Sequence, residues 1–464
     1  MVKQGSKIEN KDDLLLNTLF DEDARAREIC LDLLEYALEV VNPIKAVKST
    51  VSLQDTVLRI NDYSLDLSSI NRIFIVGAGK ASGGMAEALE AILKDKITAG
   101  TVNIPENTKQ NYRTEKIELR EAGHPLPNSK GLKGAREISA LLSTVRDGDL
   151  VFCLISGGGS ALLPMPAGEI NLQEKTVLTK SLLLSGATIN EINAVRKHVS
   201  DIKGGRLANR AYPATVISLI ISDVVDDHLD IIASGPTVPD SSTYRDAIEA
   251  LQTHKLWKDC PQTIKEHLKK GVKGIIDETP KPNNPIFSNV HNFLIANNQK
   301  ALEAINQAAK KQHFNPILLS SSIEGEASEI GEYLAGYAKK VIKKGETVKK
   351  PCVVIVGGET TVTVTGKGLG GRNQEAMLSA ARYIGGLKGV AIASIGTDGI
   401  DGVTEAAGAI INGRTLSKAQ EKELRIEDYL KNNDSYHFFK SLNDLVITGS
   451  TGTNVNDVML IVVV

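Results

Sequence analysis

The sequence has few cysteines, no long apolar run and almost no net charge. Only four cysteines occur among 464 residues, and they lie far apart without a CxxC pair. This spacing fits reduced core positions better than a disulfide frame or a zinc site, so it predicts a reducing compartment. The longest apolar runs, such as residues 458–464, suit a buried strand but are too short to span a bilayer, so no membrane partner is expected.

The charge pattern excludes a further class of partner. The net charge is −2, and the lysines and arginines are scattered instead of forming the basic face of a nucleic-acid-binding protein. The N-terminus mixes lysines with acidic residues, unlike a secretory or transit peptide, and we therefore expect a cytoplasmic protein. What remains is an ordinary globular composition, 42% apolar and 24% charged, in a chain long enough for two or more domains.

Apolar runs alternate with helical patterns along the chain. Helical spacing is found at 12–41, 81–93, 326–344 and 372–385, and a helix also precedes residue 309. Strands are predicted at 72–76, 150–155, 214–221, 292–296, 314–320, 352–356, 361–365, 390–395 and the C-terminal end. This alternation predicts an α/β fold with a largely parallel sheet covered on both faces. Ligands of such folds bind at the carboxyl ends of the strands.

The clearest linker signal is a segment rich in glycine, proline and asparagine at about 271–290. We place the domain boundary there. The sequence thus predicts an N-terminal domain of residues 1–285 and a C-terminal domain of residues 286–464.

A first glycine turn follows the predicted strand 72–76. Gly77 and Gly79 allow a close backbone approach to an anion, Lys80 adds a cation, and Ser82 begins the next helix. The turn is not a Walker loop, because Phe74 stands where that motif needs its first glycine, and Ser82 replaces the third glycine of the dinucleotide motif. An anion site and a tight structural connection are both compatible with this turn.

A second glycine turn follows the strand 150–155. Three consecutive glycines sacrifice backbone entropy, which favours an anion cradle over a simple bend. The predicted binding residues are Ser156, Gly157, Gly158, Gly159 and Ser160. His124 lies in a proline-flanked loop, where a structural role is the better reading, although a substrate-facing imidazole is the alternative.

Charged residues follow in two further segments. Arg196 and Lys203 belong to basic clusters that either clamp a carboxylate or phosphate or form a solvated helix face. Asp223 comes just after the strand 214–221, where it can bind Mg²⁺ or accept a hydroxyl proton. Helix capping is the alternative, and it suits Asp226 and Asp227 better than Asp223.

The C-terminal part has two more candidate segments. Gly370, Gly371, Arg372 and Asn373 end a flexible glycine loop at a helix start, suited to close over phosphates, with a disordered hairpin as the alternative. Asp398 lies in the Asp-Gly-rich segment 396–402, which reads as a turn but follows a predicted strand.

Taken in order, these segments resemble the glycerate 2-kinases whose C-terminal part is called the MOFRL domain. The resemblance rests on six matches along nearly the whole chain, at 76–80, 156–160, 203–205, 233–237, 370–375 and 396–402. It implies transfer of the γ-phosphoryl group of ATP to the 2-hydroxyl of D-glycerate, with Mg²⁺. It also implies a cleft between a Rossmann-like N-terminal domain and a smaller C-terminal α/β domain, with the MOFRL region at about 350–464.

By this resemblance, Lys80, Asp223 and Arg372 match the charged positions nearest the chemistry. Lys80 and Arg372 would neutralise phosphoryl or carboxylate oxygens, and Asp223 would orient the hydroxyl or bind the metal. The chain departs from the expected pattern at Asp226, which stands where a glycine is expected. This departure leaves the local turn and a second metal carboxylate open.

Two other functions share some of these features. A hydroxypyruvate reductase requires a nicotinamide site, but the first glycine turn lacks the third glycine and no acidic ribose partner follows at the expected distance. A nucleotide or sugar-acid binding module without turnover would share the anion loops. A monomer and a homodimer are both compatible with the sequence, and it does not assign ATP or glycerate to a particular loop.

Overall fold

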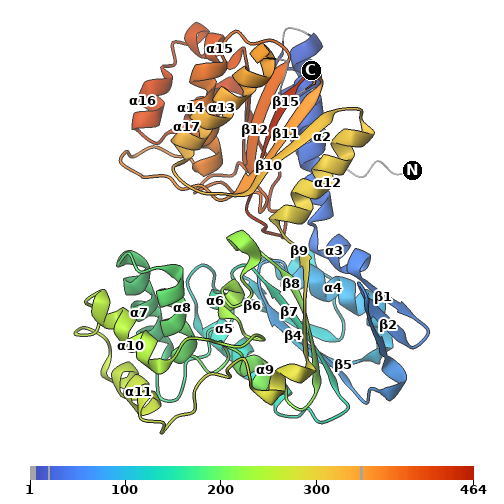
Figure 1. Ribbon diagram of the computed structural model, residues 1–464, viewed down its shortest axis with the longest axis vertical. Coiled ribbons are helices and arrows are strands. Elements are labelled where there is room, and N and C mark those ends of the chain that lie inside the picture. Colours follow the sequence, from blue (N-terminus) through green and yellow to red (C-terminus); the bar gives the residue numbers. More distant parts are fainter. Residues whose placement is uncertain (1–6, 19–20, 345–348) are drawn as a thin grey trace. The chain divides into compact units, whose positions relative to one another are not determined.

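The computed structural model describes residues 7–18, 21–344 and 349–464, and these form two compact units. The continuous unit is Pro43–Ile295. The split unit combines the described residues up to Asn42 with Ala296–Val464. In each unit helices cover a central sheet (Figure 1), which confirms the predicted α/β class.

The central sheet of the continuous unit has the strand order β6-β5-β4-β7-β8-β9, and the pairs from β6 to β8 are parallel. Its strands are β4 (Ile73–Ala78), β5 (Ile97–Pro105), β6 (Ile117–Ala122), β7 (Leu150–Ser156), β8 (Thr215–Ile221) and β9 (Val290–Ala296). β4 and β7 are buried along their whole length, as expected of parallel strands covered on both faces.

Alternate side chains of these strands contact different helix layers. Phe74, Val76 and Ala78 of β4 pack with α5 (Ser129–Leu142) and α9 (Arg206–Ala211) on one face. α4 (Ser82–Leu93) packs against β4, β5 and β7, and also against α3 (Pro43–Thr50). A small antiparallel sheet consists of β1 (Val51–Gln54), β2 (Val57–Ile60) and β3 (Tyr63–Asp66).

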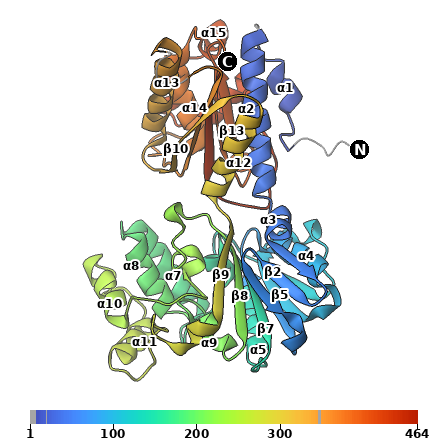
Figure 2. The ribbon, with the colours of Figure 1, turned by 45° about the vertical axis from the view of Figure 1, so that its right-hand side comes forward.

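A helical cluster with its own apolar core extends from this sheet (Figures 1 and 2). It consists of α7 (Leu172–Leu184), α8 (Ile189–His198), α10 (Tyr244–Thr253) and α11 (Gln262–Val272). The short elements of the unit are η1 (Leu67–Ser69), η2 (Lys94–Lys96), η3 (Lys109–Asn111), α6 (Gly159–Leu162), η4 (Val225–Asp227), η5 (Ile232–Ser234) and η6 (Pro285–Asn289).

The sheet of the split unit is mixed, with the order β10-β11-β15-β12-β13-β14. β10 and β11 are parallel. β15, the last strand of the chain, lies between β11 and β12 and is antiparallel to both. The strands are β10 (Asn315–Ile323), β11 (Cys352–Gly358), β12 (Val390–Gly396), β13 (Gly408–Asn412), β14 (Leu445–Val446) and β15 (Asp457–Val463).

Helices cover both faces of this second sheet (Figure 2). α2 (Asp21–Val40) and α12 (Asn298–Lys311) contact each other and the sheet on one side, with α1 (Lys11–Leu15) beside α2. The apolar core on the other face is completed by α13 (Ala327–Lys344), α14 (Arg372–Ile384), α15 (Thr415–Glu421), α16 (Ile426–Lys431) and α17 (Ser435–Leu442). None of the described helices is long and apolar enough to cross a membrane.

The observed division of the chain differs from the predicted boundary at residue 285. β9 belongs to the first sheet, and the predicted first domain included α1 and α2, which belong to the split unit. Two interactions explain this: α2 packs on β12 and β15, and the buried Arg27 of α2 binds Asp444 at 2.7 Å. The helical pattern at 12–41 predicted helices correctly, but it did not indicate which sheet they cover.

Two further expectations were wrong. The predicted linker at 271–290 is not a free connection, since Thr279 is buried and Pro280 O accepts a hydrogen bond from Asp240 N at 3.0 Å. The predicted strand at 361–365 is not formed beyond an isolated bridge at Thr361. Its backbone is held by side chains instead, as Thr363 N donates to a carboxylate oxygen of Glu326 at 3.0 Å.

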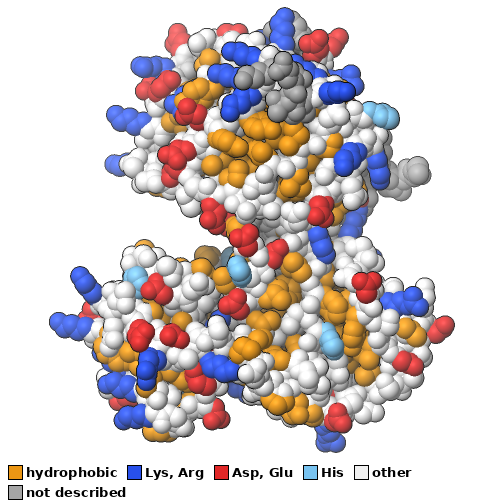
Figure 3. All heavy atoms as spheres, viewed as in Figure 1, with side chains coloured by type: hydrophobic (Ala, Val, Ile, Leu, Met, Phe, Trp, Pro, Cys, Tyr) orange, Lys and Arg blue, Asp and Glu red, His pale blue; other side chains and the backbone are white. Residues whose placement is uncertain are grey.

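The four cysteines are buried free thiols, as the sequence predicted. Less complete burial occurs at two edge strands, β9 and β10, most of whose residues are partly exposed. The space-filling view shows hydrophobic side chains gathered on the face of each unit that contains these strands (Figure 3).

The division into units predicts different behaviour for two fragments. Residues 43–295 contain a complete sheet, so this fragment should unfold cooperatively when thermal denaturation is followed by circular dichroism. Residues 1–285 lack β9 and carry α2 without the sheet that covers it. In this second fragment a protease should remove residues 1–42 rapidly, and protection of that segment would contradict the observed division.

Candidate active site

Three neighbouring parallel strands of the continuous unit end at one edge of its sheet. β4, β7 and β8 lead into the first glycine turn, the second glycine turn and the segment that begins with Ser222 and Asp223. The two glycine turns are joined, because Lys80 N donates to Gly157 O at 2.8 Å and Ala81 N donates to Ser156 Oγ at 3.0 Å. Their close approach places the predicted anion loops side by side.

The glycines of these turns are required by contacts with their neighbours. A Cβ atom on Gly79 would lie 2.0 Å from Ser156 Oγ, and one on Gly157 would lie 2.0 Å from Asp223 Oδ2. A Cβ on Gly158 would contact the His124 ring at 2.8 Å and the Lys80 side chain at 3.4 Å. Lys80, His124 and Asp223 therefore surround the second glycine turn.

Other predicted residues of the first turn have structural contacts. Gly77 lies against the Leu154 backbone, where a Cβ would be 2.1 Å from the carbonyl oxygen. Ser82 is buried, and its hydroxyl donates to Leu154 O at 3.1 Å. Gly77 and Ser82 thus hold β4 and α4 against β7. Gly159, from the second glycine turn, is the first residue of α6.

A polar chain continues from the second glycine turn to α8. Lys203 Nζ donates to both the carbonyl and the hydroxyl of Ser160 at 2.9 Å. The Ser160 hydroxyl contacts Ser234 Oγ at 3.1 Å, and Ser234 in turn donates to Asn193 Oδ1 at 3.0 Å. Arg196, also on α8, lines a pocket of about 250 Å³ together with Gly158, Ser160 and Lys203. The predicted basic residues are thus next to the predicted anion loop.

The turn after Asp223 places Asp226, rather than the expected glycine, at a position of positive φ. Asp226 has φ 61°, in the left-handed region that glycine occupies most easily and aspartate tolerates better than most residues. This observation answers the question that the sequence left open about the local turn.

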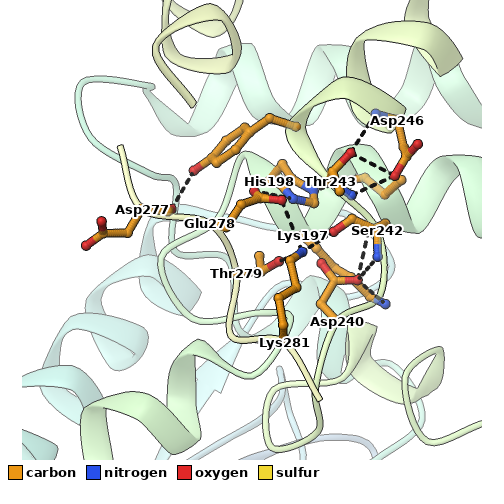
Figure 4. A network of polar contacts seen from close by, with 12 residues as sticks. Lys197, His198, Asp240, Ser242, Thr243, Asp246, Asp277, Glu278, Thr279 and Lys281 are labelled. Atoms are coloured by element: carbon orange, nitrogen blue, oxygen red, sulfur yellow. Dashed lines mark hydrogen bonds and ion pairs between the residues drawn. The ribbon is translucent and has the colours of Figure 1, made fainter. Parts of the chain in front are cut away.

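The two residues that follow Arg196 in α8, Lys197 and His198, belong to a polar network that holds the helix in place (Figure 4). Lys197 Nζ binds Asp240 Oδ1 at 3.2 Å and Asp230 Oδ2 at 3.3 Å. His198 Nε2 contacts Glu278 Oε1 at 3.1 Å, and Glu278 also pairs with Lys281 at 3.1 Å. The segment that the sequence suggested as a linker therefore anchors the helix that carries Arg196.

A second polar centre lies in the split unit, at the start of α14. Arg372 binds Asp457 through two nitrogens, Nε at 2.6 Å and Nη2 at 2.9 Å, and Glu359 through Nη1 at 3.1 Å. Burial opposes the charge, but these carboxylates raise the pKa of Arg372 above its ordinary value. The guanidinium is thus held charged in a fixed orientation.

Asp401 organises the backbone beside Arg372. Its carboxylate accepts hydrogen bonds from Asn373 N at 3.1 Å and Gln374 N at 2.9 Å, where it satisfies the free amides of the helix start. Burial raises the pKa of Asp401 to about 6, while the same amides act in the opposite direction. Gly371 precedes Arg372 as the N-cap, and a Cβ there would collide with Asp401.

The glycine loop before Arg372 is pinned rather than free. The backbone amides of Gly366, Lys367 and Leu369 donate to the side chains of residues 432–434 at 2.9–3.1 Å. These three amides therefore already have partners within the chain, and closure of the loop over phosphates stays a prediction. Gly370 lies against Ser435, and Asp398 lies near Asn373, since a Cβ on Gly396 would be 3.4 Å from Asp398 Oδ1 and 3.6 Å from Asn373 Nδ2.

Comparisons with known proteins match both parts of the chain. A domain of unknown function (DUF4147) matches residues 29–269, and the MOFRL family matches residues 352–457. Glycerate 2-kinase of Pyrococcus horikoshii is 41% identical over 442 residues, which covers 94% of this chain and 97% of the relative. This chain belongs to the glycerate kinase family.

Two further similarities were found, one to a solved glycerate kinase structure and one to a relative with a different name. The crystal structure of glycerate kinase from Thermotoga maritima has a TM-score of 0.84 and 40% identity, covering 94% of this chain and 99% of that chain. A putative hydroxypyruvate reductase of Agrobacterium vitis is 41% identical and covers 84% of this chain and 87% of its own length. The family resemblance inferred from the six sequence segments is thereby confirmed.

Two residues at the polar centres of this glycerate kinase family member lie outside the predicted segments, Lys175 and Asp457. Lys175 lines the pocket from α7 but gave no signal, because a single lysine in a helix is ordinary. Asp457 begins the last buried strand, where an acidic residue is unusual, and this position was a signal that went unused. Four further residues lie in the candidate segments but were given no individual role: Asn193, Ser234, Glu359 and Asp401.

The buried pair that anchors α8 predicts a pH-dependent loss of stability. Asp240→Asn leaves the buried Lys197 without its buried carboxylate, so the variant should unfold about 3 kcal/mol more easily at pH 7 in urea denaturation. Burial alone would raise the pKa of Asp240, but Lys197 and His198 hold it below its ordinary value. This contribution is present above the unfolded pKa and is lost as the pH falls through the folded pKa. The stability difference should therefore shrink below about pH 4.

A matched control lies nearby on the same segment. Asp246 is an exposed carboxylate that caps α10, so Asp246→Asn should cost about 1 kcal/mol or less. Equal losses for Asp240→Asn and Asp246→Asn would contradict the role assigned to the buried pair.

Proposed function

We propose that this chain is a glycerate 2-kinase, which transfers the γ-phosphoryl group of ATP to the 2-hydroxyl of D-glycerate. The observation that carries the proposal is the nearly full-length identity of about 40% to glycerate 2-kinases. We further propose a cytoplasmic enzyme that acts as a monomer or homodimer on these small molecules without a nucleic-acid or membrane partner. The proposal requires groups that position the reactants and balance the charge of the transferring phosphoryl group.

The continuous unit supplies such groups at the carboxyl ends of its strands. The second glycine turn and Lys80 would bind phosphoryl or carboxylate oxygens, since glycine amides and a cation both favour negative charge. Asp223 lies against Gly157, where its carboxylate would orient the 2-hydroxyl and accept its proton. These groups bind, orient and neutralise the reactants, and they form no covalent intermediate.

The residues around Asp223 fit a divalent metal that is held by one carboxylate and the substrate phosphates. They do not fit a metal site built from protein ligands alone. No group of three or more acidic, histidine or cysteine side chains that could hold a metal occurs among the residues that the structure describes. Mg²⁺ is commonly held by one or two carboxylates together with substrate phosphates, and a single carboxylate is compatible with that mode. Asp223 would hold such an ion, which when bound would neutralise phosphate charge.

Arg372 is the second cation that we assign to phosphoryl oxygens. A guanidinium has five N–H donors, and the bonds to Asp457 and Glu359 occupy one on each nitrogen. The two remaining N–H groups are available to an oxygen of the transferring group. Participation of residues from both units in the reaction remains a prediction.

The second candidate is a hydroxypyruvate reductase, which is favoured by the names of two relatives from Agrobacterium vitis. The first glycine turn argues against this activity, because Ser82 stands where a dinucleotide site needs its third glycine and is buried against Leu154. We therefore expect no oxidation of reduced nicotinamide cofactor with hydroxypyruvate.

Replacement of the two assigned cations should abolish most of the kinase activity. Lys80→Ala and Arg372→Ala should each lower the kcat for glycerate phosphorylation about 100-fold or more, because each removes a charge that offsets developing negative charge. The measurement is ADP release with glycerate and ATP. Activity within about twofold of the parent would show that the assigned roles are wrong.

Two exposed cations provide controls for these variants. Lys109→Ala and Arg425→Ala remove charges from surface ion pairs, one in each unit, and should leave the activity unchanged. Because Arg372→Ala also removes the partner of Asp457, thermal unfolding of each variant should be recorded beside its activity. Arg372→Lys keeps the charge but loses the fork, so it should recover only part of the kcat.

The position of the new ester bond distinguishes the kinase classes. Phosphorus and proton NMR of the product should show the phosphate on C2 of glycerate, because the proposal places the 2-hydroxyl next to Asp223. A phosphate on C3 would contradict the proposed regiochemistry while leaving the kinase activity itself in place.

A further inference from the structure

The pocket of about 250 Å³ in the continuous unit lies where the helical cluster meets the second glycine turn. α7 and α8 form one side of this pocket, and the proline-flanked residues 125–127 with the glycine turn form the other. Gly158 lines the pocket and also contacts His124 and lies near Lys80. The pocket is therefore continuous with the residues to which we assign the chemistry.

Three buried or partly buried cations line this pocket without a carboxylate partner. They are Lys175 of α7, Arg196 of α8 and Lys203. Among the residues that the structure describes, no ion pair within 4 Å joins any of the three to a carboxylate, and no acidic residue lines the pocket. Lysines and arginines are rarely buried unless they are paired, so this set is unusual.

Lys175 is the less satisfied of the two buried lysines in this pocket. Its side chain is 5% exposed, and Nζ has a single long contact, with Met165 O at 3.5 Å. Lys203, 1% exposed, donates only to neutral oxygens such as those of Ser160. Lys175 thus retains hydrogen-bonding capacity for a ligand, whereas three neutral oxygens occupy the donors of Lys203 and leave only its charge uncompensated.

The electrostatic state of these lysines agrees with a missing anion. Burial lowers the pKa of Lys175 to about 7, Arg196 acts in the same direction, and Asp201 opposes the shift. Burial also lowers the pKa of Lys203, and the charges of Lys175 and Arg196 add to this effect. Lys180, at the exposed rim of the pocket, adds a further positive charge. A bound anion would reverse these shifts and draw a proton onto the site.

The size and walls of the pocket select the kind of anion. Leu126, Pro164 and Leu183 make much of its surface apolar, and such walls are costly for a polyphosphate that must lose its hydration. The volume is also below the roughly 300–1,000 Å³ of sites for drug-sized ligands and cofactors. A short carboxylic acid places one charge among the cations and its carbon chain against the apolar side.

We propose that this pocket binds the carboxylate of the acceptor hydroxy acid through Lys175, Arg196 and Lys203, with the hydroxyl directed towards the second glycine turn. The inference rests on the proposed function and deepens it, because it assigns the acid end of the substrate to one subsite. It also makes Lys175 a binding residue that neither the sequence motifs nor the comparisons single out.

The test is the variant Lys175→Met, examined in the full chain. Met has a similar length and no charge, so the variant should fold at least as stably as the parent, which thermal unfolding checks. The KM for D-glycerate should rise at least tenfold, while the KM for ATP should stay within twofold. Lys133→Met, an exposed position on α5 of the same unit, is the control and should change neither constant.

Calorimetric titration tests the site without turnover. D-glycerate, inorganic phosphate and ADP are titrated separately into the parent and into Lys175→Met at pH 7.5, in two buffers with different ionisation enthalpies. We expect glycerate to bind the parent with proton uptake, and we expect the variant to lose at least tenfold in affinity and most of that uptake. Lys175→Arg, which restores the charge, should recover part of the affinity.

Other outcomes overturn the proposal. An increase in the KM for ATP alone, or a loss of ADP binding without a loss of glycerate binding, would assign the pocket to the nucleotide. Unchanged constants in both assays would show that the cations serve the fold. Glycerate binding that depends on Lys175 without any phosphorylation by the parent would instead refute the proposed function and leave the subsite in place.

Discussion

The parallel pairing of β4, β7 and β8 is the constraint on which the continuous unit depends. Because the three strands run in the same direction, their carboxyl ends meet at one edge and bring Lys80, the second glycine turn and Asp223 together. The approach is so close that a side chain on Gly157 would occupy the position of the Asp223 carboxylate. The glycines therefore serve the contact between two loops as well as an anion.

This arrangement explains which parts of the site were predictable from sequence. A buried run followed at once by glycine or aspartate marks the carboxyl end of a strand, and parallel strands collect such ends at one edge. The positions of Lys80, Ser160 and Asp223 followed from that rule. That rule does not apply to Arg372, because α14 follows a loop rather than a strand. Arg372 was predicted instead from the glycine loop that ends in a cation at a helix start, and from the family resemblance.

Other features depend on contacts between distant segments, which a local pattern does not encode. The amphipathic pattern of α2 predicts a helix but not which sheet it covers, and its partner Asp444 lies 417 residues away. Likewise, the glycines of 366–371 suggest freedom, but residues 432–434 bind their amides. The proline-rich segment near 280 resembles a linker, although Glu278 and Thr279 pack against α8 and its surroundings. In each case the local composition suggests one conformation, but contacts with residues far away in the sequence determine the structure that forms.

The buried cations discussed above fall into two groups. Some have a carboxylate partner and stabilise the fold, and others have none and are the ones we assign to ligand binding. Arg27 and Lys197 are buried, and each faces a buried carboxylate of its own chain, at 2.7 and 3.2 Å respectively. These pairs offset their desolvation cost within the protein. Lys175 and Lys203 have no such partner, so the folded chain retains an electrostatic cost that contributes nothing to its own stability. A bound anion would offset the desolvation cost of these two ammonium groups. The free energy of binding would then include this electrostatic contribution, which is absent from the ligand-free chain.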